Sequence, residues 1–212
     1  MICRLIILIV LFSVRTVTAA EINGCTITSA TLCTEMDLSG ANLRNADLAR
    51  SALRQSNFTG ADMRSANLLN ADMVLANLNK ANLDGAMLNE ADLKNATLID
   101  AKLTGARLNG ANLKSANLTG ANLTGAELKG ANLSGANLTR AKFGSAELQR
   151  ADLSGTVMSG ADFRGANMVG VNLNNATLRG ANLTEAILGD IDFSNADTDG
   201  CIGCPHVAQT SP

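Results

Sequence analysis

Large apolar side chains recur at every fifth position along most of the chain. Steps of five from Leu38 to Phe193 give 32 central positions, and all are Leu, Phe or Met. Ala stands two residues before the centre in 26 of these 32 repeats. The frame is never shifted over about 160 residues, so it predicts one continuous repetitive domain. The exceptions to Ala are Met36, Ser51, Ser56, Thr156, Val171 and Ile191.

A period of five fits neither a helix nor a straight strand. On an α-helix each step of five residues rotates by about 140°, so the central residues would spiral over all faces. On a straight strand, successive central residues would alternate between the two sides because five is odd. The chain must therefore bend once per repeat to keep every central side chain inside. Gly, Ser or Asn often stands two residues after the centre, which suits a tight bend.

The repeat is plainest at 111–125, which reads Ala-Asn-Leu-Lys-Ser, Ala-Asn-Leu-Thr-Gly, Ala-Asn-Leu-Thr-Gly. This pattern closely resembles the pentapeptide-repeat family, over about residues 36–200. The resemblance implies an all-β fold, a right-handed quadrilateral parallel β-helix with one repeat per side and about eight coils. Residues 20 apart would then lie above one another. One inward ladder would comprise Leu38, Phe58, Leu78, Leu98, Leu118, Leu138, Met158 and Leu178.

Residues 1–20 have the layout of a secretory signal peptide. Arg4 precedes the apolar run 5–12, and Thr18-Ala19-Ala20 supplies small residues before Glu21. The run is shorter than the roughly 20 residues that a spanning helix needs, although an uncleaved anchor is the alternative. We expect export to a periplasm or thylakoid lumen, or secretion, with no membrane attachment after cleavage.

The two ends of the solenoid should carry caps. We interpret residues 21–35 as an irregular first coil or cap, in which Ile27 and Leu32 fit as central residues. Because six residues separate Leu32 from Leu38, the frame is expected to slip by one there. Residues 201–212 are interpreted as a C-terminal cap and tail, where Pro205 helps to stop strand addition.

The chain without residues 1–20 contains four cysteines, two near each end of the expected rod. Disulfides need Cα atoms within about 7 Å. In an oxidising compartment we therefore expect the bridges Cys25–Cys33 and Cys201–Cys204. A zinc site on all four is excluded by distance. The alternatives at the C-terminal pair are a metal site that adds His206 and a thioredoxin-like redox motif.

Composition and charge disfavour several classes of function. Aromatic residues make up 2% of the chain and His206 is its one histidine, which disfavours base-stacking nucleic-acid binding and His-based catalysis. Without residues 1–20 the formal charge is −4, with a basic zone at 101–150 of 7 bases and 2 acids. The eight Asn-X-Ser/Thr triplets follow from the repeat itself, so they indicate no glycosylation.

The remaining candidate chemistry is two pairs of outward carboxylates. Asp72 is expected over Asp92, and Glu127 over Glu147, about one strand spacing apart. Such pairs are typical of acid–base or cation sites, but a flat face offers no enclosing pocket, so we interpret them as solvated surface. Lys94 and Lys114 stack similarly. We predict no catalytic, metal-binding or cofactor-binding residues.

The sequence thus predicts a non-enzymatic exported solenoid that presents its faces or ends to an unknown protein partner, with an end-to-end homodimer as a further expectation. The alternative is a mimic of DNA that binds DNA gyrase, as in the quinolone-resistance members of the family. The export signal, the modest charge and the basic zone count against this alternative. A hydrolase acting through Asp72 or Glu127 is the third hypothesis.

Overall fold

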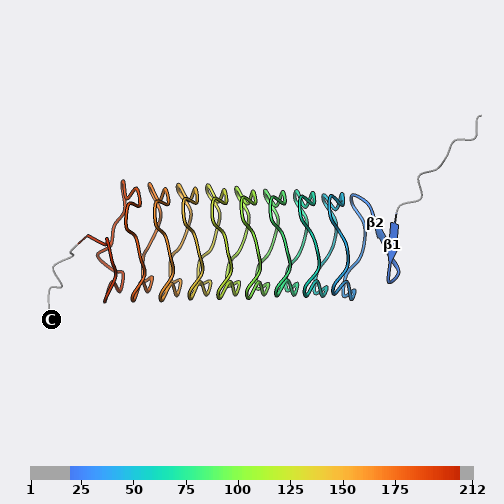
Figure 1. Ribbon diagram of the computed structural model, residues 1–212, viewed down its shortest axis with the longest axis horizontal. Helices are drawn as coiled ribbons and strands as arrows, with labels where there is room; N and C mark the ends of the chain where they lie inside the picture. The colour runs from blue at the N-terminus through green and yellow to red at the C-terminus, as the bar shows by residue number, and fades with distance from the viewer. Residues whose placement is uncertain (1–19, 206–212) are drawn as a thin grey trace, which may run out of the picture.

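The computed structural model describes residues 20–205. The chain forms a long stack of similar coils with a short β-hairpin at its N-terminal end (Figure 1). The predicted signal peptide, apart from Ala20, lies outside the described residues, as does His206. No helix is present between residues 20 and 205 that is long and apolar enough to cross a membrane.

The hairpin joins β1 (Ala20–Ile22) to β2 (Cys25–Ile27) in antiparallel register, with Ile22 opposite Cys25. Its two-residue loop is Asn23-Gly24, and both residues have positive φ, 50° and 82°. Two consecutive positive φ angles define the type I′ turn, whose twist matches that of paired strands and which favours Asn-Gly. The local sequence therefore encodes this cap.

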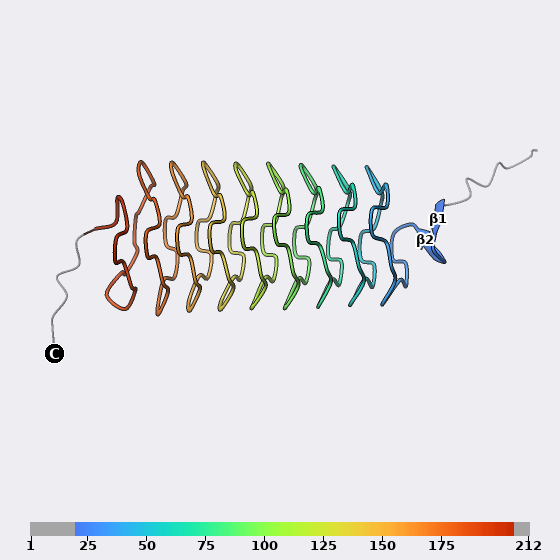
Figure 2. The ribbon, with the colours of Figure 1, turned by 60° about the horizontal axis from the view of Figure 1, so that its bottom comes forward.

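The coils are held together by a constant register of 20 residues. Parallel β-bridges run from Leu32–Ala52 to Asn182–Ile202, and bridged residues follow one another every five positions, with one gap at Asn172 in the last coil. Four repeats thus complete one coil, so the solenoid has four sides. Figure 2 shows the successive coils stacked along one axis. Each bridge has two backbone hydrogen bonds, such as Leu118 N–H to Asn137 C=O at 2.8 Å and Asn137 N–H to Ala116 C=O at 2.9 Å.

A turn at every corner produces the bend that the period of five demands. In the first of these turns, the Ala41 N–H donates to the Leu38 carbonyl at 3.1 Å, and Gly40 between them has a φ of 65°. This is the type II pattern, which favours Gly at its third position. Non-glycine residues also adopt this conformation, among them Arg150 at a φ of 58°.

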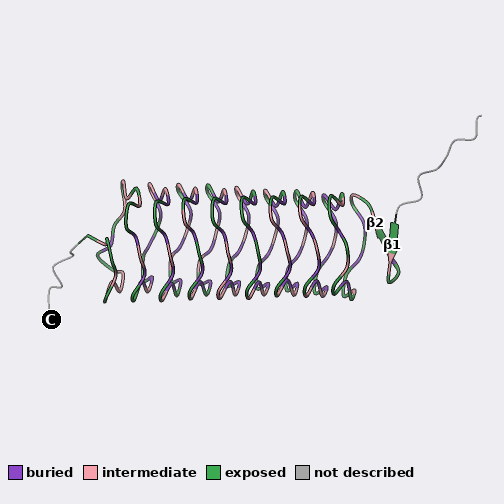
Figure 3. Ribbon diagram, viewed as in Figure 1, coloured by how far each residue is buried: buried purple, intermediate pink, exposed green. Residues whose placement is uncertain are grey.

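The interior is a column of central side chains. Of the 32 central residues, 31 are buried, and Leu188 in the last coil is partly buried (Figure 3). All eight residues of the ladder that begins at Leu38 have an exposed fraction of 0%. Phe143 and Phe163 stack with ring centroids 4.8 Å apart, one coil above the other. Each fully buried central residue contributes on the order of 1.5–3 kcal/mol.

The expectation that Leu32 is a central residue is wrong. Leu32 is 86% exposed, whereas Cys33 is 2% exposed and occupies the inward position. Counting back from Leu38 in steps of five leads to Cys33, so the frame does not slip here. Ala30 also has the positive φ expected two residues after a centre, and its N–H donates to the Ala49 carbonyl. Cys33 lies inside because it is bonded to Cys25, which leaves Leu32 facing outward.

Candidate functional site: the outer faces and the two ends

The outer surface consists of four flat faces. Face 1 contains the central residues at 38 and every 20 residues beyond, and faces 2, 3 and 4 begin at central positions 43, 48 and 53. The side chains on either side of each central residue point outward. In the middle coil, the residues that follow the centre are Thr119, Thr124, Lys129 and Ser134, one on each face.

Most Asn and Asp residues that precede a central residue cap the turn that follows. The Asn117 Oδ1 atom accepts hydrogen bonds from the Thr119 N–H at 3.1 Å and from the Thr119 hydroxyl at 2.7 Å. Asp37 Oδ1 accepts the Ser39 N–H in the same way. An acceptor two residues before a turn amide is the Asx-turn arrangement. The side chains of these residues therefore accept hydrogen bonds from the backbone of the turn. The sequence analysis missed this role, although the preference for Asn or Asp directly before the central residue indicates it.

The first carboxylate pair lies where the sequence predicts. Asp72 and Asp92 are bridged neighbours on face 4. Arg54 donates to both Asp72 oxygens, at 3.3 and 3.1 Å. Asp92 Oδ1 accepts from the Lys94 N–H at 3.1 Å and from the Asn112 amide at 2.9 Å. Both carboxylates are thus already engaged in the surface network.

The second pair is engaged in the same way on face 3. Glu127 lies 3.6 Å from Arg107 and accepts a hydrogen bond from Asn109 at 2.9 Å. Glu147 lies 3.7 Å from Lys129 and accepts from Gln149. Each carboxylate therefore has its own cation in the preceding coil. This alternating ladder favours the surface interpretation over an acid–base dyad.

Two aspartates on face 2 have a clear electrostatic environment. The Arg64 guanidinium donates to Asp62 at 2.7 Å, and this hydrogen bond lowers the pKa of Asp62 from 3.8 to about 2. Arg164 donates to both oxygens of Asp162, at 2.8 and 2.7 Å, and likewise lowers the pKa of that carboxyl. Hydrogen bonds to the ionised form explain both shifts.

Lys94 and Lys114, which were predicted to stack, lie one coil apart on face 4, but they form no close ion pairs in the described residues. Neither Lys94 nor Lys114 has a carboxylate within 4.0 Å in residues 20–205. Face 1 differs from the other three in the residues that directly precede its central residues and form the β-bridges. From Asn57 to Thr177, none of these residues is charged. The four faces therefore differ in their surface chemistry.

The hollows on these faces are shallow. The larger, about 640 Å³, lies on face 2, where Gly144 has no side chain. It is lined by Thr124, Lys142, Gly144, Ser145, Asp162, Arg164, Gly165, Thr184 and Glu185. A second, about 510 Å³, lies on face 3 beside Gln149, whose buried Oε1 atom has no hydrogen-bond donor in the described part of the chain. Both hollows are open, so neither has the enclosure of a catalytic pocket.

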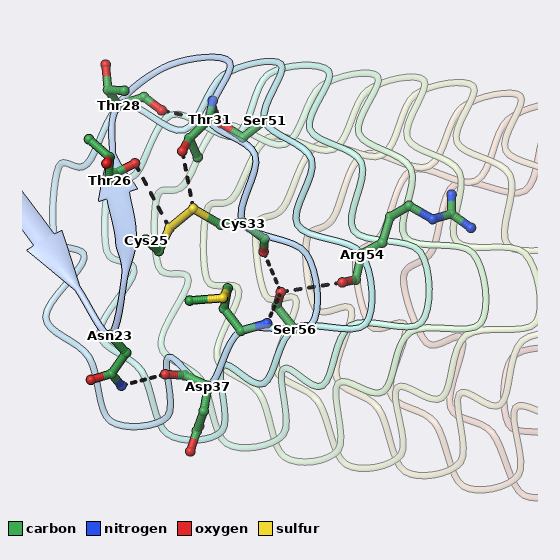
Figure 4. Close-up of a disulfide and its surroundings, with 11 residues drawn as sticks. Asn23, Cys25, Thr26, Thr28, Thr31, Cys33, Asp37, Ser51, Arg54 and Ser56 are labelled. Atoms are coloured by element: carbon green, nitrogen blue, oxygen red, sulfur yellow. Dashed lines mark hydrogen bonds between the residues drawn. A yellow bond between two sulfur atoms is a disulfide. The ribbon is translucent and has the colours of Figure 1, made fainter.

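The N-terminal end is closed by a buried bridge and two buried hydroxyls (Figure 4). Cys25 and Cys33 form a disulfide with their Cα atoms 5.4 Å apart. Ser56, which replaces the usual Ala, donates to the Cys33 carbonyl at 2.7 Å and accepts from the Met36 N–H at 3.1 Å. Ser51 accepts from the Thr31 N–H at 3.2 Å. The Ala exceptions in this region thus attach the first coil to the second.

The C-terminal end carries the second bridge, Cys201–Cys204, with Cα atoms 5.7 Å apart. Because these two sulfurs are bonded to each other, they do not offer thiolates to a metal. Among residues 20–205 there is no group of three His, Cys, Asp or Glu side chains that could hold a metal ion. The alternative metal site also required His206, which lies outside the described residues.

Comparison with known proteins points to one family. The family model for pentapeptide repeats matches residues 33–73, 76–114, 106–144, 116–157, 146–184 and 176–201. A search of curated proteins finds no match. Among solved structures, HetL, a pentapeptide repeat protein involved in heterocyst differentiation regulation in the cyanobacterium Nostoc sp. strain PCC 7120, is 33% identical. The match covers 84% of this chain and 90% of HetL, with a TM-score of 0.36.

Two further solved structures are similar to this chain. A pentapeptide repeat protein from the Arabidopsis thaliana thylakoid lumen is 35% identical over 47% of this chain and 69% of its own, with a TM-score of 0.45. Full-length QnrB1, a plasmid-mediated fluoroquinolone resistance protein, is 21% identical over 80% of this chain and 90% of its own, with a TM-score of 0.37.

Proposed function

The chain belongs to the pentapeptide repeat family, and we propose that it is an exported, non-enzymatic scaffold whose right-handed solenoid presents one face to a protein partner. The observation that carries this proposal is the state of the outward carboxylates. Asp72, Asp92, Glu127 and Glu147 are all committed to ion pairs or hydrogen bonds of the surface. The described faces are flat and regular, and the hollows at Gly144 and Gln149 are open, which suits recognition of another macromolecule better than turnover of a small substrate.

The proposed compartment is an oxidising one, a periplasm, a thylakoid lumen or the outside of the cell. Two disulfides support this, because such bridges persist where thiols are not kept reduced. The apolar run at residues 5–12 supplies the route of export. The lumenal relative from Arabidopsis is consistent with the proposal.

The alternative function is gyrase binding by DNA mimicry, and an experiment must distinguish it from the scaffold function. A mimic of DNA needs an extended run of negative charge on its surface. Here residues 101–150 carry 7 bases against 2 acids, and both acids, Glu127 and Glu147, face a base. We therefore expect no inhibition of gyrase supercoiling by the purified chain, and inhibition would reverse the order of the two hypotheses.

We also propose that the C-terminal end is where two copies would meet. Ile187 lies in the last coil and is 55% exposed. Contact between two such ends would cover apolar surface that a monomer leaves in water. Sedimentation of the purified chain tests this: a dimer that Ile187→Asp converts to a monomer supports it, and a monomer at all concentrations contradicts it.

The scaffold proposal is tested by cross-linking in the cell that makes the protein. A photoreactive phenylalanine analogue is placed singly at position 119, 124, 129 or 134, one on each face of the middle coil. The four variants share the same turn position, so they serve as controls for one another. We expect a discrete cross-linked product from one face. The absence of a product from all four, or equal products from all four, would contradict a face-specific partner.

A further inference from the structure

The two disulfides differ in how far water reaches them. Cys25 and Cys33 have exposed fractions of 0% and 2%, and the Thr31 hydroxyl lies 3.2 Å from the Cys33 sulfur. Cys201 and Cys204 are only partly buried. Ile202 between them is 58% exposed, and Gly203 and Pro205 are exposed as well. One bridge is therefore sealed in the core, while the other lies at the surface.

This difference decides which bridge can react. A disulfide is reduced when a thiolate attacks one of its sulfur atoms, so the reaction requires access to that atom. Because Cys201 and Cys204 are partly exposed, we expect a thiolate to reach their bridge in the folded chain, whereas it reaches the buried Cys25–Cys33 bridge only if the first coil opens. We propose that Cys201–Cys204 is a reversible redox site, reduced by a dithiol oxidoreductase while Cys25–Cys33 stays intact.

The reaction balances in two exchange steps. A thiolate of the oxidoreductase attacks one sulfur, forms a mixed disulfide with it and releases the other cysteine as a thiolate, which takes up a proton. The second thiol of the oxidoreductase then displaces the chain, which leaves with both cysteines as thiols. The two electrons come from the oxidoreductase dithiol, which becomes a disulfide.

The bridge closes a loop that is hydrogen-bonded to the preceding coil. The Ile202 N–H donates to the Ala181 carbonyl at 2.9 Å, and the Ile202 carbonyl accepts from the Leu183 N–H at 2.7 Å. Gly203 lies so close to the preceding coil that an added Cβ would come within 2.8 Å of the Leu183 carbonyl carbon. Reduction removes the covalent closure of this loop. We infer that it loosens segment 198–205 and uncovers the strand edge at Leu183.

The exposed Ile202 side chain gives the oxidoreductase a place to dock. It stands between the two cysteines and more than half of its surface is in water. Apolar contact beside the reacting sulfurs would hold the partner in position for attack. Asp is an ordinary residue at this point of the repeat, as Asp162 and Asp197 show, so Ile202→Asp should preserve the coil.

The experiment compares the two bridges within one molecule. The folded full chain is treated with dithiothreitol for graded times, free thiols are blocked with iodoacetamide, and each cysteine is quantified by mass spectrometry. We expect Cys201 and Cys204 to be labelled at least ten times faster than Cys25 and Cys33. In guanidinium chloride the difference should disappear. Equal rates in the folded chain, faster opening of Cys25–Cys33, or four free thiols in native material would overturn the proposal.

Docking is tested with a bacterial thioredoxin whose second active-site cysteine is replaced by serine, which traps the mixed disulfide. We expect a covalent adduct with the wild-type chain and an adduct at least fivefold slower with Ile202→Asp, while dithiothreitol reduces both chains at similar rates. An unchanged adduct rate would overturn the docking role of Ile202. Amide exchange at Ile202 and Leu183 should accelerate in the reduced chain, and unchanged exchange would overturn the loosening of segment 198–205. Neither readout depends on the scaffold's partner.

Discussion

The Asn79 side chain accepts a hydrogen bond from the Ile99 N–H, 2.8 Å away and one coil above. The turn at Ile99 follows Thr97, which has no carbonyl side chain with which to cap it. The cap therefore comes from the neighbouring coil. Capping by the neighbouring coil also occurs at three other turns that lack their own Asn or Asp. The acceptor and donor pairs are Asp84–Thr104, Asn89–Asn109 and Asn109–Lys129. The solenoid thus satisfies the same turn amide in two ways.

We predict that Asn79→Ala destabilises the chain by about 0.5–1.5 kcal/mol, because the Ile99 N–H loses its acceptor. Urea unfolding measures the change. The matched control is Asn174→Ala, since the turn above Asn174 is capped by its own Asp192. We expect less than about 0.5 kcal/mol from the control, as for other surface substitutions. Equal losses from the two variants would contradict capping between coils.

Ser56→Ala should destabilise the N-terminal coil even though it restores the commonest residue of the repeat. Ser56 has an exposed fraction of 0% and satisfies both the Cys33 carbonyl and the Met36 N–H. Leaving buried groups unpaired costs about 1–3 kcal/mol. Thermal unfolding of this variant is compared with that of Ser159→Ala, an outward serine. A Ser56→Ala variant as stable as wild type would show that the hydroxyl is dispensable.

Acid should weaken the Asp62–Arg64 pair within a defined pH range. The pKa of Asp62 is lowered from 3.8 to about 2 by Arg64, so the folded state holds this proton less tightly than the unfolded state. Its stabilising contribution is present above about pH 4 and is lost as the pH falls toward 2. Carbon-13 NMR titration of the carboxyl should give a midpoint near 2. Arg64→Gln should raise that midpoint toward the ordinary value and leave the pKa of Asp162 unchanged.

Export should leave a chain that begins at Glu21. Thr18-Ala19-Ala20 supplies the small residues that signal peptidases require before their cleavage point. Intact-mass measurement on the protein recovered from its native host tests this. The expected mass corresponds to residues 21–212 with four hydrogens fewer, one pair for each disulfide. A full-length chain would indicate that residues 1–20 are retained.

The inward ladder was predictable because only two residues in five point into so narrow a column, and only the central one of the two is large. A large apolar residue at 32 central positions leaves no competing frame, and the register of 20 followed from the family resemblance. The error at Leu32 arose because hydrophobicity favours Leu over Cys as a buried residue. Strict counting from Leu38 leads to Cys33 instead, and the bond to Cys25 explains its position.

Other features depend on contacts that a repeat pattern does not reveal. The Asn23-Gly24 turn was a local signal of a hairpin that the sequence analysis did not use. The role of Ser56 depends on which carbonyl lies beside it, one coil away. The cations paired with Glu127 and Glu147 lie 20 and 18 residues earlier in the chain, so these ion pairs can be predicted only once the coil length is known. The exposure of the two disulfides likewise depends on how each end is covered.

The central claim is that position within the repeat decides whether a side chain faces the core or the outer surface. Leu118 and Thr119 are adjacent in sequence, but Leu118 is fully buried and Thr119 lies on face 1. The most direct measurement is the free energy of unfolding of Leu118→Asp and Thr119→Asp. We predict that Leu118→Asp unfolds the chain or costs more than about 4 kcal/mol, whereas Thr119→Asp stays within about 0.5 kcal/mol of wild type. Equal losses from the two variants would contradict the account.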